Sequence, residues 1–144
     1  MYKHILIATD GSELAAKAVK TGLALARQLG AKVTAVTATE PWSAMVTGET
    51  ALAFPIEDYE KAAAEDAARI LSAVGEAAKK QGVACETVHV NDFPAEAIVA
   101  TAKSKGCDLI VMSSHGRRGL ARMLLGSQAT RVLTLSIVPV LICR

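Results

Sequence analysis

Residues 4–39 read HILIATDGSELAAKAVKTGLALARQLGAKVTAVTAT. The stretch begins and ends with short apolar runs, at residues 4–9 and 32–39, and such runs predict strands. Apolar positions with helical spacing lie between the two runs, at Leu14, Ala18, Gly22, Leu25 and Leu29. Ser12 is a common helix-capping residue and Gly30 a common helix stop, so both ends of a helix are marked. The stretch therefore predicts a strand–helix–strand unit.

The same alternation continues along the chain. Further strands are predicted at residues 85–90, 108–113 and 139–143. Further helices are predicted at residues 55–81, 92–106 and 126–136. Several strands are apolar on both faces, as strands covered by helices on each side must be. We therefore expect an α/β fold in a single domain over residues 1–144: a doubly wound, five-stranded parallel sheet with helices on both faces.

One long segment, EPWSAMVTGETALAF at residues 40–54, is expected to be irregular. Loops of this length are often lids or binding loops. A solvated insertion explains the segment equally well, so both interpretations stand at this point.

Composition limits the classes of function. Hydrophobic residues make up 51% of the chain and charged residues 21%, which excludes disorder. The apolar runs fall short of the ~20 residues that cross a bilayer, and the first residues lack the cleavage site of a signal peptide. We therefore expect a cytoplasmic protein without a membrane partner. A net charge of +2 and an aromatic content of 3% give no basis for nucleic-acid binding.

Cysteine and histidine spacing predicts no metal centre. Cys85, Cys107 and Cys143 lie far apart and form no Cys-x-x-Cys pair, so we expect reduced, packed thiols. His4 and His89 are expected to be strand-edge or surface residues, and neither shows ligand spacing with a cysteine.

Two loops are candidates for an anion site. The first strand runs into Thr9 and Asp10, and the fourth runs into the sequence SSHG that ends at Gly116. Ligands of such sheets bind beyond the carboxyl ends of the strands, so these loops would share one crevice if the two strands are neighbours. Gly116 and Gly119 permit positive φ and a close backbone approach.

A helix start follows the second loop. Gly126 and Ser127 open the last predicted helix, whose N-terminal N–H groups favour a phosphate. Glycines also serve as ordinary loop and cap residues. An anion site and a simple connection therefore both remain open from these residues alone.

Several longer motifs are more specific. The chain carries ATDGS after the first strand, EP after the second, D-x-P-A at the start of the third helix, and VMSSHGRRGLARMLLGS followed by a helix and PVLIC. With these motifs the chain resembles a universal stress protein of the nucleotide-binding kind over essentially its whole length. The resemblance implies a Rossmann-like fold of the adenine nucleotide alpha hydrolase type.

The family's nucleotide motif is Gly, two residues, Gly, nine residues, Gly, then Ser or Thr. Here the second glycine is Gly116, the nine residues are 117–125, and the closing pair is Gly126 and Ser127. Ser113 stands where the motif has its first glycine, so the closest backbone approach differs at that point. We expect Ser113→Gly to leave the affinity equal or modestly improved if the hydroxyl merely lines the pocket.

The resemblance implies that ATP or a related adenine nucleotide is bound as a regulatory ligand in a stress response. Asp10 would face the ribose or a nucleotide-bound Mg²⁺, the backbone at Ala38 would contact the adenine edge, and the motif loops would hold ribose and phosphates. The residues expected to bind the nucleotide are Thr9, Asp10, Ala38, Met112, Ser113, His115, Gly116, Arg117, Gly126, Ser127 and Gln128.

Other interpretations of the site residues stand beside this one. Ser114 and His115 suggest a nucleophile and base, but neighbours on a strand point to opposite faces and no third group is apparent. His115 is expected instead to position the loop or to donate to a phosphate. Asp10 would also serve as a helix cap. The basic cluster is either solvated loop charge or a contact for phosphate or a partner, and consists of Arg117, Arg118 and Arg122.

Two alternatives to a regulatory nucleotide binder are a slow ATPase and a nucleotide-free dimeric scaffold. We find no general base, so we expect at most weak ATP hydrolysis. The resemblance further implies a homodimer through the last strand, residues 139–143, which would cover an otherwise unpaired edge. Leu141→Pro should then favour the monomer. The regulatory protein partner is not identified by the sequence.

Overall fold

The computed structural model describes residues 1–116 and 124–144. The strands are β1 (His4–Ala8), β2 (Lys32–Thr39), β3 (Cys85–Asn91), β4 (Leu109–Ser113) and β5 (Val140–Cys143). The helices are α1 (Glu13–Leu29), α2 (Trp42–Met45), α3 (Glu49–Ala53), α4 (Ile56–Lys80), α5 (Pro94–Lys105) and α6 (Ser127–Leu135).

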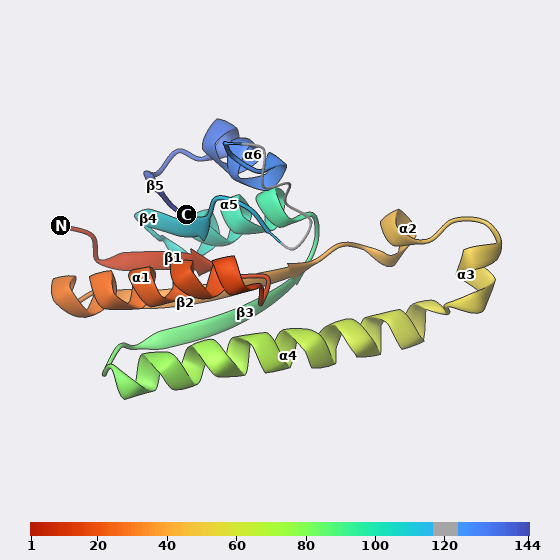
Figure 1. Ribbon diagram of the computed structural model, residues 1–144, viewed down its shortest axis with the longest axis horizontal. Helices are drawn as coiled ribbons and strands as arrows, with labels where there is room; N and C mark the ends of the chain where they lie inside the picture. Colours follow the sequence, from red (N-terminus) through yellow and green to blue (C-terminus); the bar gives the residue numbers. More distant parts are fainter. Residues whose placement is uncertain (117–123) are drawn as a thin grey trace.

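The strands form one parallel sheet in the order β3-β2-β1-β4-β5. Helices α1 and α4 cover one face of the sheet, and α5 and α6 cover the other (Figure 1). The chain builds outward from β1 in one direction through β2 and β3, and in the other through β4 and β5. The expected doubly wound, five-stranded α/β fold is therefore confirmed, and its strand order reverses between β1 and β4.

Strand β1 lies at the centre of the core. All five of its residues are buried, between β2 on one edge and β4 on the other. Ile5 and Ile7 pack into the apolar cluster under α1 and α4, while Leu6 and Ala8 pack into the cluster under α5 and α6. This explains why the strand is apolar at successive positions, since a strand with one face in water would alternate apolar and polar residues.

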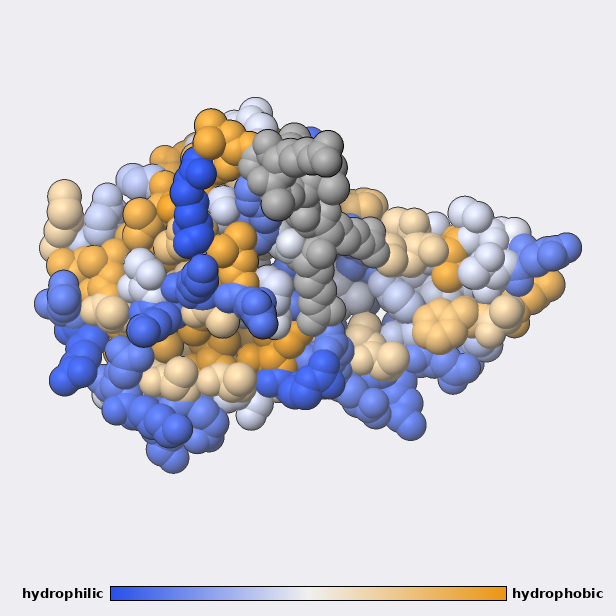
Figure 2. Space-filling view, viewed as in Figure 1, coloured by the Kyte–Doolittle hydropathy of each residue, from blue (hydrophilic) through white to orange (hydrophobic). Residues whose placement is uncertain are grey.

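The segment at 40–54 is not irregular as expected, because it contains the short helices α2 and α3. Trp42 Nε1 donates to the carbonyl oxygen of Phe54 at 2.8 Å, and Tyr59 Oη donates to that of Glu40 at 2.6 Å. The first bond joins the two ends of the segment, and the second holds the start of the segment against α4. Together with the start of α4, the segment forms an arm that extends beyond the sheet (Figures 1 and 2).

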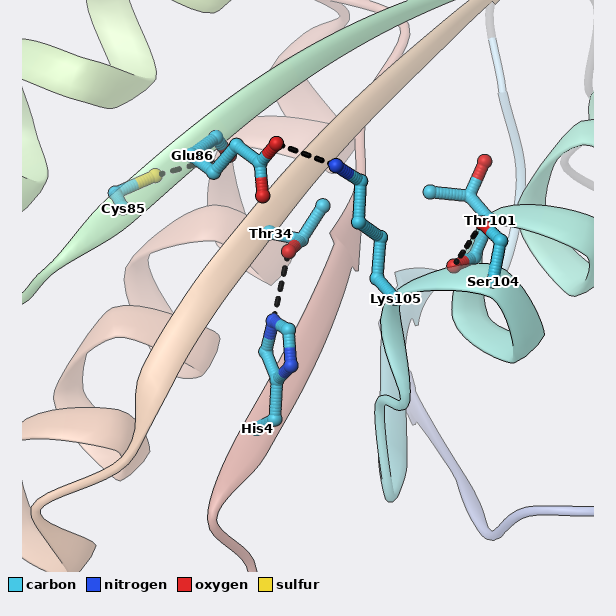
Figure 3. Close-up of polar contacts among 7 residues, drawn as sticks. All are labelled: His4, Thr34, Cys85, Glu86, Thr101, Ser104 and Lys105. Atoms are coloured by element: carbon cyan, nitrogen blue, oxygen red, sulfur yellow. Dashed lines mark hydrogen bonds and ion pairs between the residues drawn. The ribbon is translucent and has the colours of Figure 1, made fainter.

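His4 is not a surface residue, because β1 is a central strand. Its side chain is 7% exposed, and its Nε2 lies 2.7 Å from Thr34 Oγ1 on the neighbouring strand (Figure 3). Burial, followed by the positive charge of Lys32, lowers the pKa of His4 from its ordinary value. His89 fits the expectation better, since it is an exposed residue on edge strand β3 and contacts Thr39.

The carboxylate of Asp108 fastens the start of β1. It accepts the backbone N–H groups of Lys3 and His4, at 2.9 and 3.1 Å. Burial acts to raise the pKa of Asp108, but these two donors, together with its own backbone N–H and the charge of His4, hold the pKa below its ordinary value.

All three cysteines are free thiols, and Cys107 is buried. Burial raises the pKa of Cys107 to about 11, so this thiol stays protonated at neutral pH. No helix in the described part of the chain is long and apolar enough to span a bilayer.

The buried His4 predicts a pH dependence of stability. The pKa of the His4 ring is lowered in the folded state and is ~6.5 in the unfolded state. Below that pH, the unfolded state therefore binds the proton more readily than the folded state. The free energy of unfolding should be fully retained above about pH 6.5 and should fall as the pH drops toward the folded pKa. Urea titrations across this range measure the loss.

The control is His4→Gln, whose amide can replace the bond to Thr34 but does not titrate. Its free energy of unfolding should change less between pH 7 and pH 5 than that of the wild type. Equal slopes in the two proteins would show that His4 is not the responsible group. The loss of stability that is linked to Asp108 occurs at more acidic pH, because the pKa of that carboxyl group is lowered in the folded state.

Candidate functional site

A cavity of about 790 Å³ lies at the carboxyl ends of the strands, where β1 and β4 are neighbours. Its walls come from both faces of the sheet and from the arm. Ten of the residues expected to bind a nucleotide line it: Thr9, Asp10, Ala38, Met112, Ser113, His115, Gly116, Gly126, Ser127 and Gln128. Arg117, Arg118, Gly119 and Arg122 lie outside the described residues.

The loops after β1 and β4 touch at Asp10 and Gly116. A Cβ added to Gly116 would lie 2.7 Å from Asp10 Oδ2, which is too close for any side chain unless the carboxylate moves. Gly116 does not have a positive φ. The glycine therefore leaves room for the Asp10 carboxylate in this position, and it does not adopt the unusual backbone conformation that the sequence suggested.

Asp10 shapes the turn that leads into α1. Its Oδ1 accepts the N–H of Ser12 at 2.9 Å, and Ser12 Oγ in turn accepts the N–H of Ala15 at 3.2 Å. Ser12 is therefore the helix cap, and Asp10 supports the turn before it. The capping role considered for Asp10 belongs to Ser12.

The loop after β4 is fixed by hydrogen bonds to distant parts of the chain. Ser114 N donates to the carbonyl oxygen of Cys143 at the end of β5, and Gly126 N donates to that of Ser114, both at 2.7 Å. A Cβ on Gly126 would lie 2.9 Å from the Ser114 oxygen. Gly126 therefore permits a close backbone contact that holds α6 against the end of β4.

The hydroxyl of Ser113 is engaged as well. It donates to the carbonyl oxygen of His115 at 2.8 Å, and the residue is 8% exposed. Ser113 therefore stabilises the loop in addition to lining the cavity. Ser113→Gly would remove this bond, so the side chain does more than fill the place of a glycine.

Ser114 and His115 contact each other, contrary to the expectation from strand alternation. The strand ends at Ser113, and His115 Nδ1 lies 3.1 Å from Ser114 Oγ. His115 Nε2 is buried and has no hydrogen-bond partner in the described structure. A buried polar atom without a partner at a cavity wall is typical of a position that contacts a ligand.

Helix α6 directs its N-terminus at the cavity. Gly126 is the N-cap and Ser127 the first helical residue. The first N–H groups of any helix have no partner within the helix, and they carry its positive dipole end. Because Gly126 donates to Ser114, the N–H groups next in line, from Ser127 onward, are the ones available to an anion.

The far wall of the cavity comes partly from residues 40–54, for which a binding loop was one of the two open interpretations, and partly from α4, which sequence reasoning missed. The wall is formed by side chains of the arm and of the first turns of α4, including Met45, Phe54, Tyr59 and Ala63. Phe54 and Tyr59 pack edge to face, with ring centroids 5.9 Å apart. The one available signal was the presence of Trp42 and Phe54 in the segment that looked irregular.

The residues that line the cavity suit a phosphorylated ligand. It combines a carboxylate, two glycines at close contacts and a helix N-terminus, beside an apolar wall. In the described ranges, no three His, Cys, Asp or Glu side chains gather as the ligands of a metal ion would. Binding of an anion with an apolar or aromatic part is the chemistry that this arrangement favours.

Comparisons with known proteins give one consistent result. The model of the universal stress protein family matches residues 1–144. Universal stress protein YxiE of Bacillus subtilis is 33% identical over 148 residues, covering 100% of both chains. Universal stress protein MJ0531 of Methanocaldococcus jannaschii is also 33% identical over 148 residues, covering 100% of this chain and 83% of its own length.

Solved structures agree with this result. Protein MJ0577 of Methanocaldococcus jannaschii superposes with a TM-score of 0.86 at 28% identity, covering 99% of this chain and 96% of the other. A universal stress protein in complex with cAMP superposes with a TM-score of 0.74 at 30% identity, covering 99% and 97%. On the match over its whole length, this chain belongs to the universal stress protein family.

Proposed function

We propose that this protein binds ATP or a related adenine nucleotide as a regulatory module in a stress response. The observation that carries the proposal is the convergence of Asp10, Gly116 and the α6 N-terminus on one cavity. The relative solved with cAMP, at 30% identity, supports an adenine nucleotide as the ligand class. Occupancy would then alter the surface that a regulatory protein partner contacts.

The proposed roles follow from position in the cavity. The phosphates lie at the N-terminus of α6, where the N–H groups from Ser127 onward donate to them. The backbone at Ala38, at the end of β2, contacts the adenine edge. Thr9, Met112 and His115 complete the walls around the ribose. Arg117, which follows Gly116 in the sequence, would add positive charge.

Asp10 is the group that fits a nucleotide-bound Mg²⁺. A single carboxylate suits an ion that brings its remaining ligands as waters and phosphate oxygens. Such an ion would neutralise phosphate charge beside Asp10. We place the protein in the cytoplasm, since its three free thiols suit a reducing compartment.

The proposal includes a homodimer through β5. This strand is at the edge of the sheet, and Ile137 beside it is 90% exposed. The carbonyl oxygens of Pro139 and Cys143 accept N–H groups from Ile110 of β4 and from Ser114 just after it. By alternation the backbone groups of Val140 and Ile142 point outward. Pairing two such edges about a two-fold axis would satisfy them.

The first prediction uses Ser127→Asp. Ser127 is exposed at the start of α6, where a carboxylate stabilises a helix, so the fold should be unaffected. The added charge should repel the phosphates and weaken ATP binding by about tenfold or more. Titration calorimetry measures the loss. Gly126 is unsuitable for this test, because any side chain there collides with Ser114.

Ser127→Asn is the matched control, because asparagine has nearly the same shape as aspartate but carries no charge. It should bind ATP more tightly than Ser127→Asp, and adenosine, which has no phosphate, should separate the two variants much less. Equal ATP affinities in the wild type and Ser127→Asp would remove the α6 N-terminus from the proposed phosphate site.

The ligand that copurifies with the protein distinguishes the functional alternatives. Mass spectrometry after denaturation should release an adenine nucleotide, mainly the triphosphate, from a regulatory binder. Mainly diphosphate would favour the slow ATPase, and no nucleotide together with no binding in calorimetry would favour the scaffold.

The dimer prediction uses Ile142→Pro. The N–H of Ile142 points away from β4, so proline there removes a donor from the outer edge and should shift sedimentation toward the monomer. Leu141→Pro is the wrong variant for this purpose, because the Leu141 N–H faces β4 and its loss would damage the sheet.

Ile142→Ala is the control, since it truncates the same side chain and keeps the N–H. It should remain more dimeric than Ile142→Pro. A wild-type protein that sediments as a monomer at micromolar concentration would contradict the proposed interface, as would an Ile142→Pro variant that stays fully dimeric.

A further inference from the structure

Gln128 connects the N-termini of two helices. It is the second residue of α6, and its Oε1 accepts the N–H of Ala95, near the start of α5, at 3.1 Å. Phe93, the N-cap of α5, supplies no side-chain hydrogen bond of its own. The amide oxygen of Gln128 therefore caps α5 from the neighbouring helix.

This cap fixes which way the Gln128 amide faces. The N–H of Ala95 needs an acceptor, so it selects the amide oxygen and turns the NH₂ group to the other side of the amide carbon. Gln128 lines the cavity together with Pro94, the first residue of α5. Among the described residues, Gln128 makes no hydrogen bond besides the one to Ala95. Its two N–H donors therefore have no partner among the described residues and are available to a ligand in the cavity that Gln128 lines.

The electrostatic surroundings favour an acceptor that carries negative charge. Helix α5 has 12 residues and begins at Pro94, and α6 has 9 residues and begins at Ser127. The positive dipole ends of both helices therefore lie near Gln128. Glu96 lies nearby on α5, where Arg131 of α6 pairs with its Oε1 and balances its charge, while its Oε2 is buried without a hydrogen-bond partner among the described residues. An oxygen of a ribose or of a phosphate is the kind of group that this corner of the cavity can hold.

We propose that Gln128 determines specificity in the nucleotide site by donating from Nε2 to an acceptor oxygen in the ribose–phosphate part of the ligand. The inference rests on the proposed function and extends it. Because Ala95 holds the amide in one orientation, Gln128 cannot rotate to present its oxygen instead. The site therefore selects ligand groups that accept a hydrogen bond over groups that donate one.

Two variants separate the cap from the donor. Gln128→Glu keeps an oxygen for Ala95 and adds negative charge at two helix N-termini, so its unfolding midpoint should not decrease. It loses the NH₂ group and should bind ATP about tenfold or more weakly. Gln128→Met loses both the oxygen that caps α5 and the NH₂ donor, and it adds no charge. Its dissociation constant for ATP should rise roughly three- to tenfold.

Arg131→Met is the matched control for helix packing. It breaks the ion pair with Glu96, which also joins α5 to α6, and leaves the Gln128 amide in place. Its ATP affinity should fall much less than that of Gln128→Met, because the uncovered charge of Glu96 is the one change near the ligand. If Arg131→Met weakens binding as much as Gln128→Met does, the effect comes from helix packing and the inference is overturned.

Calorimetry with ATP, AMP and adenosine on all four proteins completes the test. A loss in Gln128→Met for all three ligands supports a ribose oxygen as the acceptor, and a loss confined to ATP and AMP supports a phosphate oxygen. Gln128→Met affinities equal to the wild type overturn the inference and leave the proposed function standing. A wild type that binds none of the ligands overturns both.

Discussion

The fold depends on the burial of β1 on both faces and along both edges. Its apolar side chains enter both core clusters, and its backbone pairs with β2 and β4. A central parallel strand must end at the same edge of the sheet as its neighbours. This brings Asp10, one residue beyond the end of the buried stretch, beside the loop that follows β4. The position of the candidate site is thus a consequence of the core.

The two loops at this edge are held by backbone contacts as well as by side chains. Gly126 N donates to Ser114, Ser114 N donates to Cys143, and Gly116 lies against the Asp10 carboxylate. Each contact needs a small residue or a particular peptide orientation. The same network links the cavity to the end of β5, the strand through which we propose dimerisation. A ligand at the α6 N-terminus would therefore act on a loop already connected to the edge of the sheet.

Helix α4 and the arm make the other half of the cavity. The sheet itself supplies one side of the cavity, and the first turns of α4 with Met45, Phe54 and Tyr59 supply the opposite wall. Internal hydrogen bonds from Trp42 and Tyr59 keep the arm folded. The depth of the site is thus decided by a segment whose sequence shows no clear period.

The sequence by itself determined the order of the five strands and the four longer helices, the parallel sheet and the loops that face the site, because periodicity and helix-capping residues act over short distances. Residues such as Ser12, Gly30 and Gly126 mark boundaries that the structure has at those positions. Only the tertiary structure decided the burial of His4, the turn-supporting role of Asp10, the cap that Gln128 gives to α5, and the far wall on the arm. The physical reason is that each of these depends on a partner brought close by packing, and neither composition nor spacing encodes which partner that is.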